Sequence, residues 1–222
     1  MSNWPLPLWI AHRGAGKLAP ENTLAAFRLG AHYGYRAFEC DVKLSRDGQP
    51  FLLHDSTLDR TTPERGLAGT RDWAELSHLD AGRWHSRSFA GEPLPSLGAI
   101  AAFVIANRHA LNIEIKPTPG EALLTGRAVG RKVLELWAAS GPLLPPLPLF
   151  SSFEPEALRG ARETAPEVPR GLLLDTLRSG WLDEARSLGC LAVITNYRVM
   201  DLGTIDAIHA VGMKAVVYTV ND

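Results

Sequence analysis

The chain has 222 residues, of which 45% are hydrophobic and 21% charged, a composition typical of a globular domain with one sizeable core. A formal net charge of −1 without any basic run argues against nucleic acid or an anionic membrane surface as a partner. No apolar run approaches the roughly 20 residues that span a bilayer, and the first residues carry no basic leader, so neither membrane insertion nor a signal peptide is expected. Cys40 and Cys190 lie far apart and suggest no disulfide, which predicts a reducing, cytoplasmic location.

Short apolar strands alternate with helical patterns along the chain. Strands are expected at residues 8–12, 37–42, 111–116, 147–152, 170–174, 191–194 and 214–220. Helices are expected at residues 22–33, 96–108, 121–139, 155–164, 177–188 and 201–211. This alternation requires a parallel sheet covered by helices. We interpret residues 1–222 as a single domain, with a compact insertion rich in Gly, Pro and Arg at about 55–97.

A β-hairpin is predicted where Asp47-Gly48 separates two apolar runs, because a type I′ turn needs positive φ at both central residues. If these two residues form the turn, residues whose numbers sum to 95 face each other. Asp41 then lies opposite His54, and Glu39 lies on the same face. Two carboxylates and an imidazole without an apolar neighbour indicate a reactive site or a metal site.

Polar residues gather at the carboxyl ends of the expected strands. They are His12 and Arg13, Glu39 and Asp41, Glu114 and Lys116, Ser151 to Phe153, Thr195 and Asn196, and Tyr218. A closed parallel barrel builds its active site at this rim, because every strand-to-helix loop begins there. A doubly wound sheet places its ligand at one switch point and does not need charged residues on several strand ends. A barrel is therefore the preferred fold.

A series of short motifs extends over nearly the whole chain. The motifs are His12-Arg13-Gly14, Pro20-Glu21-Asn22-Thr23, Glu39-Cys40-Asp41-Val42, Asp47-Gly48, His54-Asp55, Arg60-Thr61-Thr62, Ile113-Glu114-Ile115-Lys116 and Tyr218-Thr219-Val220-Asn221. In content and order the series resembles the glycerophosphodiester phosphodiesterase family, in its cytosolic bacterial form. The resemblance implies a TIM (β/α)8-type barrel that hydrolyses glycerophosphodiesters to an alcohol and sn-glycerol 3-phosphate. It also implies one divalent cation, Mg²⁺ or Ca²⁺.

The chemistry of the residues supports the roles that the resemblance implies. Glu39, Asp41 and Glu114 offer a hard oxygen site, which suits magnesium or calcium and not zinc. Arg13 can fork two phosphate oxygens, whereas Lys116 provides a point charge. A bland alternative is that the three acids only form ion pairs with these two cations.

His12 and His54 are the predicted acid–base pair, because the unperturbed imidazole pKa lies nearest neutrality. We expect an in-line displacement in which one histidine activates the nucleophile and the other protonates the leaving alkoxide. The nucleophile is either water or the neighbouring glycerol hydroxyl, and the second route forms a cyclic phosphate first.

The remaining polar and aromatic residues have either a role in the site or a purely structural one. Glu21 either belongs to the site or only interacts favourably with a helix dipole. Three aromatic residues either line the pocket or only pack in the protein interior: Phe153, Tyr218 and Trp84. Lys43 and Arg46 are expected to be solvated, Asp55 to be structural, and Arg60 to tie down the insertion.

The chain departs from the family pattern at its end. It stops just after the expected strand at 214–220, where the family continues with a helix, a strand and a closing helix. A barrel without these elements has two unpaired edge strands, so we expect a truncation of roughly 25 residues.

Two rival functions are retained. A lysophospholipase D-like phosphodiesterase should show an apolar groove near the insertion, where only scattered aromatic residues occur. A non-catalytic phosphate-binding barrel should lack one histidine or one acid, and here both histidines and all three acids are present. The head group of the substrate cannot be read from the sequence.

Overall fold

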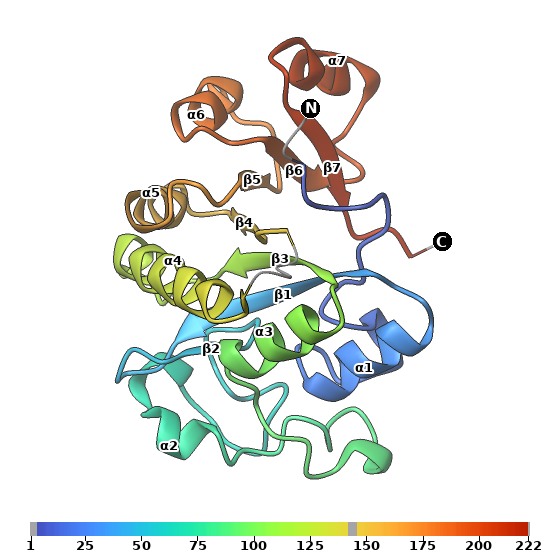
Figure 1. Ribbon diagram of the computed structural model, residues 1–222, viewed down its shortest axis with the longest axis vertical. Helices are drawn as coiled ribbons and strands as arrows, with labels where there is room; N and C mark the ends of the chain where they lie inside the picture. The colour runs from blue at the N-terminus through green and yellow to red at the C-terminus, as the bar shows by residue number, and fades with distance from the viewer. Residues whose placement is uncertain (1–3, 142–145, 222) are drawn as a thin grey trace.

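The computed structural model describes residues 4–141 and 146–221 and contains a seven-stranded sheet (Figure 1). Its strands are β1 (Ala37–Leu44), β2 (Pro50–Leu52), β3 (Ala110–Ile115), β4 (Leu149–Ser152), β5 (Arg170–Leu174), β6 (Ala192–Asn196) and β7 (Lys214–Tyr218), in the order β2-β1-β3-β4-β5-β6-β7. Only the β1–β2 pair is antiparallel, and all other neighbours are parallel. The predicted alternation of strands and helices around a parallel sheet is confirmed.

The helices follow the predicted pattern closely. They are α1 (Leu24–His32), α2 (Trp73–Leu76), α3 (Leu97–Ala106), α4 (Ala122–Ala138), α5 (Pro155–Thr164), α6 (Trp181–Ser187) and α7 (Leu202–Ala210). Side chains of Thr23, Ser96 and Asp201 accept hydrogen bonds from the first turns of α1, α3 and α7 and so fix where these helices begin. Helix α6 begins later than expected, because Gly180 precedes it in the left-handed region at φ +78°. None of the described helices is both long and apolar enough to cross a membrane.

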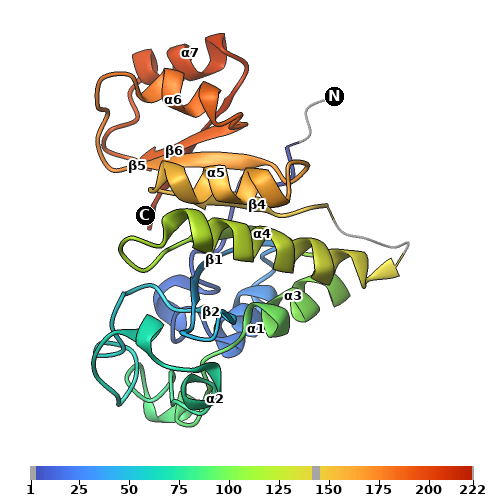
Figure 2. The ribbon, with the colours of Figure 1, turned by 90° about the vertical axis from the view of Figure 1, so that its left-hand side faces the viewer.

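Helices α4 and α5 lie side by side across one face of the sheet (Figure 2). Small residues allow this close approach. A Cβ atom on Gly126 would lie 2.0 Å from the carbonyl oxygen of Ala157, and one on Gly160 would lie 2.2 Å from that of Leu123. The outward-facing strand residues, among them Phe38, pack beneath the helices in the main hydrophobic core.

The inward face of the sheet divides along the strands. Near the strand starts it is apolar, where Ala37, Leu149 and Ala192 pack with Leu6 in a separate cluster. Because side chains alternate along a strand, the next inward position of β1 after Ala37 belongs to Glu39. On β1 and β3, charged side chains therefore occupy the inward face only toward the carboxyl ends.

The expected first strand at 8–12 is wrong. The described chain forms only a parallel bridge there, in which Ala11 accepts from the backbone of Glu39 and donates to Ala37 at 2.9 Å each. Leu8 and Trp9 are exposed by 84% and 67%, so they provide no burial that would extend the strand. Among the described residues, β7 pairs with β6 alone, and the closing helix–strand–helix segment stays a prediction.

The hairpin register differs by one residue from the prediction. Val42 pairs with Leu52 and not with Leu53. Only Gly48 has positive φ, at +81°, and its N–H donates to the carbonyl of Ser45 at 2.9 Å. Asp47 is held by the backbone N–H of Trp73 at 2.9 Å, outside the left-handed region. The loop is therefore a three-residue turn with a glycine bulge, and the extra residue shifts the pairing.

His54 consequently lies just beyond the end of the hairpin ladder. The backbone N–H of Leu53 donates to the carbonyl of Asp41 at 3.1 Å, so these two residues, and not Asp41 and His54, are opposite. The predicted pairing of His54 with Asp41 is wrong, although both residues still belong to the same rim.

The segment from 55 to 97 has its own hydrophobic cluster, built with residues of β2. The cluster contains Phe51, Leu53, Leu58, Ala68, Leu76, Ala81 and Leu94. In both views the segment with α2 occupies one end of the molecule and α7 the other (Figures 1 and 2). It places the loop that carries His54 beside the carboxyl ends of β1 and β3.

Candidate active site

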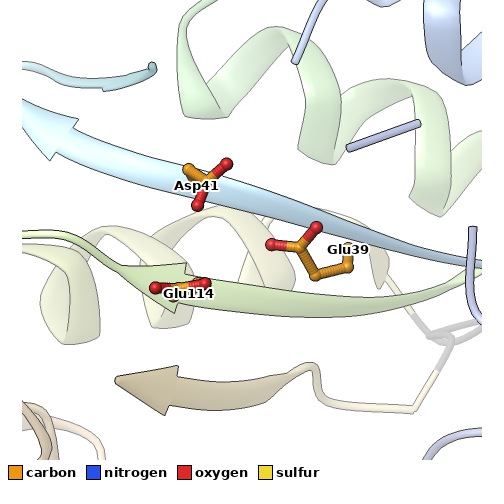
Figure 3. A group of neighbouring side chains, drawn as sticks. All are labelled: Glu39, Asp41 and Glu114. Carbon is orange, nitrogen blue, oxygen red and sulfur yellow. The ribbon is translucent and has the colours of Figure 1, made fainter. Parts of the chain in front are cut away.

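Three carboxylates converge on the inward face of two neighbouring strands (Figure 3). Glu39 and Asp41 come from β1 and Glu114 from β3, and the parallel register places Asp41 directly beside Glu114. One oxygen from each carboxylate lies within 4.8 Å of the others. The structure thus brings together all three residues that were predicted to bind a metal.

These carboxylates are buried at a high electrostatic cost. Burial raises the pKa of Glu39 well above its ordinary value, and the charges of Asp41 and Glu114 raise it further. Burial and the charge of Asp41 also raise the pKa of Glu114 to about 7, although Lys116 Nζ lies 2.8 Å from its Oε1 atom. In the described part of the chain, buried Glu39 Oε1 and Asp41 Oδ1 have no hydrogen-bond partner. Unpartnered carboxylate oxygens that face one another fit a hard divalent cation.

Asn22 fixes the orientation of Asp41 and was missed as a site residue. Its side-chain amide donates to Asp41 Oδ2 at 2.7 Å, and its side-chain oxygen accepts from the Asp41 backbone N–H at 3.0 Å. Asn22 is 3% exposed and has φ +59°, a conformation that asparagine tolerates better than most residues. From the sequence, Asn22 was placed only at the start of the expected helix at 22–33 and in a motif, and the cap of α1 is Thr23.

Arg13 is packed among the acids. Its backbone N–H donates to Glu39 Oε2 at 2.9 Å, its guanidinium donates to Glu21 at 2.9 Å, and Nε lies 3.3 Å from Asp41 Oδ2. The adjacent His12 has its Nε2 atom 3.8 Å from Glu39 Oε2. Burial lowers the pKa of His12 to about 4, and the charge of Arg13 adds to this effect. Arg13 therefore contacts several of the acids, whereas His12 approaches the cluster at Glu39 alone.

The second histidine is held by a network of charged residues. His54 Nδ1 lies 2.7 Å from Asp55 Oδ1, and Arg60 donates to both oxygens of Asp55 and both oxygens of Glu21. Burial lowers the pKa of His54, whereas the charge of Asp41 and the hydrogen bond to Asp55 oppose the shift. Glu21 thus lies between two arginines, which is more than a helix-dipole role requires.

A cavity of about 290 Å³ adjoins the cluster. It is lined by Lys43, His54, Asp55, Ser56, Glu114, Ile115, Lys116, Pro117, Ser152, Phe153 and Glu154. Cations, an imidazole and a carboxylate of the candidate metal site thus share one hollow. It is large enough for a phosphate with a small polyol.

The aromatic candidates have different surroundings. Phe153 lines the cavity, with Lys116 Nζ 5.4 Å from its ring centre. Tyr218 packs edge-on against Phe153 at 5.9 Å but does not line the cavity. Trp84 lies instead beneath the guanidinium of Arg60, at 5.9 Å. Of the three aromatic residues, only Phe153 reaches the hollow.

Lys43 corrects the expectation of a solvated residue. It is 2% exposed, and its Nζ donates to the backbone carbonyl of Lys116 at 3.1 Å. Burial lowers its pKa to about 8, and the charge of Lys116 contributes. Strand alternation could have found it, because Lys43 follows Glu39 and Asp41 on the same face.

Comparisons with known proteins agree with this geometry. The model of the glycerophosphoryl diester phosphodiesterase family matches residues 12–222. A glycerophosphodiester phosphodiesterase of Caldanaerobacter subterraneus is 36% identical over 75% of this chain and 66% of its own length. A putative glycerophosphodiester phosphodiesterase of Bacillus subtilis is 31% identical over 96% of this chain and 86% of its own.

Solved structures agree as well. An Oleispira antarctica phosphodiesterase in complex with its product sn-glycerol-3-phosphate has a TM-score of 0.89 and 36% identity, covering 98% of this chain and 86% of its own. A glycerophosphodiester phosphodiesterase from Agrobacterium tumefaciens has a TM-score of 0.77 and 29% identity, covering 96% and 87%. These neighbours confirm the predicted TIM-barrel type of fold. The chain belongs to the glycerophosphoryl diester phosphodiesterase family.

Proposed function

We propose that this protein hydrolyses glycerophosphodiesters to an alcohol and sn-glycerol 3-phosphate. The observation that carries the proposal is the buried carboxylate cluster, which His12, Arg13 and Lys116 adjoin and which shares a cavity with His54. The similar Oleispira phosphodiesterase binds sn-glycerol-3-phosphate as its product, which supports this choice of substrate class.

Glu39, Asp41 and Glu114 would hold one divalent cation, Mg²⁺ or Ca²⁺. Their donor set consists of carboxylate oxygens alone, and two of these oxygens are buried without a partner among the described residues. When bound, such a cation supplies Lewis-acid stabilisation of the negative charge on a phosphate oxygen.

The protein's own side chains bind the phosphate and move the protons. Arg13 and Lys116 flank the carboxylates and bind phosphate oxygens, one by a fork and one as a point charge. His12 and His54 act as the acid–base pair: one takes a proton from the nucleophile, and the other protonates the leaving alkoxide. The neutral form of His12 at neutral pH suits proton acceptance.

The nucleophile is either water or the glycerol hydroxyl next to the ester. A single-turnover ³¹P NMR time course with a short-chain glycerophosphodiester distinguishes the two routes. A transient cyclic phosphate supports attack by the hydroxyl, and direct appearance of glycerol 3-phosphate supports water.

The test of the function is release of glycerol 3-phosphate from glycerophosphocholine, measured by a coupled assay with and without a chelator. We expect release that EDTA abolishes and that Mg²⁺ or Ca²⁺ restores. His54→Ala should lose it, whereas His78→Ala, which alters an exposed histidine, should retain it. Release that persists in EDTA and in His54→Ala contradicts the proposal, and preferential cleavage of lysophosphatidylcholine supports the lysophospholipase D-like alternative.

A cytoplasmic location is part of the proposal. Cys40 and Cys190 are both buried and unpaired, as expected of a protein that works in a reducing compartment.

A further inference from the structure

An arginine of the 55–97 segment connects the two sides of the candidate active site. We propose that Arg60 is a positioning residue that sets the orientation of two loops, the one with His12 and Arg13 and the one with His54. This inference rests on the proposed function. Through Asp55 it orients the imidazole of His54. Through Glu21 it holds the guanidinium of Arg13. The sequence predicted only that Arg60 ties down the insertion.

The first half of the connection fixes the ring of His54. Arg60 Nε donates to Asp55 Oδ2 at 2.7 Å and a terminal nitrogen donates to Oδ1 at 3.1 Å, a two-point contact that holds the carboxylate plane. Asp55 Oδ1 in turn lies 2.7 Å from His54 Nδ1. A carboxylate accepts only from a protonated Nδ1, so this contact selects one tautomer and leaves Nε2 free for proton transfer.

Asp55 remains a carboxylate over the whole working range of pH. The hydrogen bond from Arg60 is the largest influence on it and lowers its pKa to about 2, and the contact with His54 contributes. Although Asp55 directly follows His54 in the chain, the side-chain torsions of both residues can rotate, so the backbone alone does not fix the angle between carboxylate and ring. Arg60 supplies the missing restraint.

The second half of the connection fixes Arg13. Arg60 donates to Glu21 Oε2 at 2.8 Å and to Oε1 at 2.6 Å, and Glu21 Oε1 also accepts from Arg13 at 2.9 Å. Arg13 has φ +52°, a strained conformation that its surroundings must maintain. The position of the neighbouring His12 therefore depends on the Glu21 carboxylate, which Arg60 also contacts.

The geometry requires a guanidinium and not only a positive charge. Arg60 engages two carboxylates at once with three nitrogen atoms, and its flat face lies over Trp84. Lysine has one nitrogen and no planar fork, so it cannot restrain both carboxylates. We expect Arg60→Lys to reduce kcat, whereas a purely electrostatic role would tolerate this substitution.

Arg46 provides a matched control. It also forms a two-point contact with one aspartate, in which Nε and a terminal nitrogen donate to Asp72 at 2.8 and 2.5 Å. This pair joins the hairpin loop to the segment with α2, but it contacts neither histidine. If Arg60 only ties down the insertion, substitutions at the two arginines should have similar effects.

The experiment compares Arg60→Lys and Arg60→Gln with Arg46→Lys and Arg46→Gln in the full chain. It measures Tm, kcat and KM for glycerophosphocholine, and the ¹⁵N NMR signals of the imidazole of His54, assigned with His54→Gln. We expect both Arg60 variants to lose about 10- to 100-fold in kcat. KM should change less than kcat, and the Nδ1-protonated tautomer of His54 should give way to a mixture. The Arg46 variants should retain wild-type kcat and the wild-type His54 signals.

Two results overturn the inference. One is an unchanged His54 tautomer in both Arg60 variants, and the other is a kcat that matches that of the Arg46 variants. If the wild-type protein releases no glycerol 3-phosphate, the proposed function fails, and the NMR comparison alone decides the role of Arg60.

Discussion

The two faces of strand β1 are equally buried but chemically opposite. Phe38, Cys40 and Val42 point outward into the main core and are 0% exposed. Glu39 and Asp41 alternate with them, are 8% and 0% exposed, and point inward. Outward burial stabilises the fold through apolar contacts. Inward burial places charges where water is excluded. This lowers stability and strengthens the electrostatic interactions of the site.

Neighbouring residues of one strand are therefore expected to respond differently to substitution. Changes on the inward face should reduce activity and spare or raise stability. Changes on the outward face should reduce stability and leave the activity of each folded molecule nearly unchanged. The following predictions test this contrast, from the largest expected effect to the smallest.

Asp41→Asn should have the largest effect on activity. It removes a charge at the centre of the carboxylate cluster while keeping the shape of the side chain. We expect kcat/KM to fall roughly 10³-fold or more, since electrostatic stabilisation of several kcal/mol is lost. Tm in EDTA should change little, because relief of the repulsion from Glu39 and Glu114 offsets the weakened contacts with Arg13 and Asn22. A variant that retains activity, or that loses activity only by unfolding, contradicts the contrast.

His12→Asn should lower kcat by about 10²- to 10⁴-fold, the usual contribution of a general acid or base. His12 is partly exposed at the rim and lies on neither face of a strand, so Tm should change little. The measurement is steady-state kinetics with a thermal melt of the same sample. Near-wild-type kcat would remove His12 from the proposed acid–base pair.

Ile113→Ala should show the opposite behaviour on the outward face of β3. Ile113 is 0% exposed in the main core and directly precedes Glu114. Truncation of a buried isoleucine costs about 2–5 kcal/mol of unfolding free energy, through lost burial and a residual cavity. We expect a clear fall in the denaturant midpoint, while kcat per folded molecule stays within about twofold. A large loss of kcat at unchanged stability would contradict the separation of the two faces.

The pH dependence of stability should reveal the cost of the inward face. The pKa of Glu114 is raised from 4.5 to about 7 in the folded protein, so its contribution to stability is present below about pH 4.5 and lost as the pH rises through 7. The shift corresponds to on the order of 3 kcal/mol. The lowered pKa values of His12 and His54 act in the opposite sense, so the comparison must be with Glu114→Gln.

In EDTA, the Tm of Glu114→Gln should therefore exceed that of the wild type by a margin that grows from pH 5 to pH 8. Added Mg²⁺ or Ca²⁺ should reverse the difference at pH 8, because the cation binds only the wild-type cluster well. A margin that does not depend on pH would show that Glu114 carries no such cost.

Much of the fold could be predicted because hydrophobic periodicity is a local property. Helix α5 matches the expected bounds at 155–164, where Pro155 is a sharp start signal. The strand at 8–12 could not be excluded from its apolar content, because its exposure depends on the rest of the fold. The hairpin loop also makes a tertiary contact that the local sequence does not reveal, the hydrogen bond from the Trp73 N–H to Asp47.

The part of the site that lies on the strands could be predicted from short motifs and from the alternation of side chains. Glu39, Asp41 and Glu114 converge as expected, because the parallel register adds only a lateral pairing to a period-two pattern. Lys43 was missed because a charged residue in a hairpin is expected to be exposed to solvent, whereas Lys43 is buried. The connection of Arg60 to Glu21 could not be predicted, because it joins residues far apart in the sequence through side-chain geometry alone.

Calorimetric titration of Mg²⁺ or Ca²⁺ into the chelator-treated protein tests the central claim most directly. Run in two buffers of different ionisation enthalpy, it reports both the number of cations bound and the protons released. The account predicts one divalent cation per wild-type chain, bound with proton release, and binding that Asp41→Asn abolishes or severely weakens. Absence of binding to the wild type at millimolar cation, or equal binding by Asp41→Asn, would contradict it.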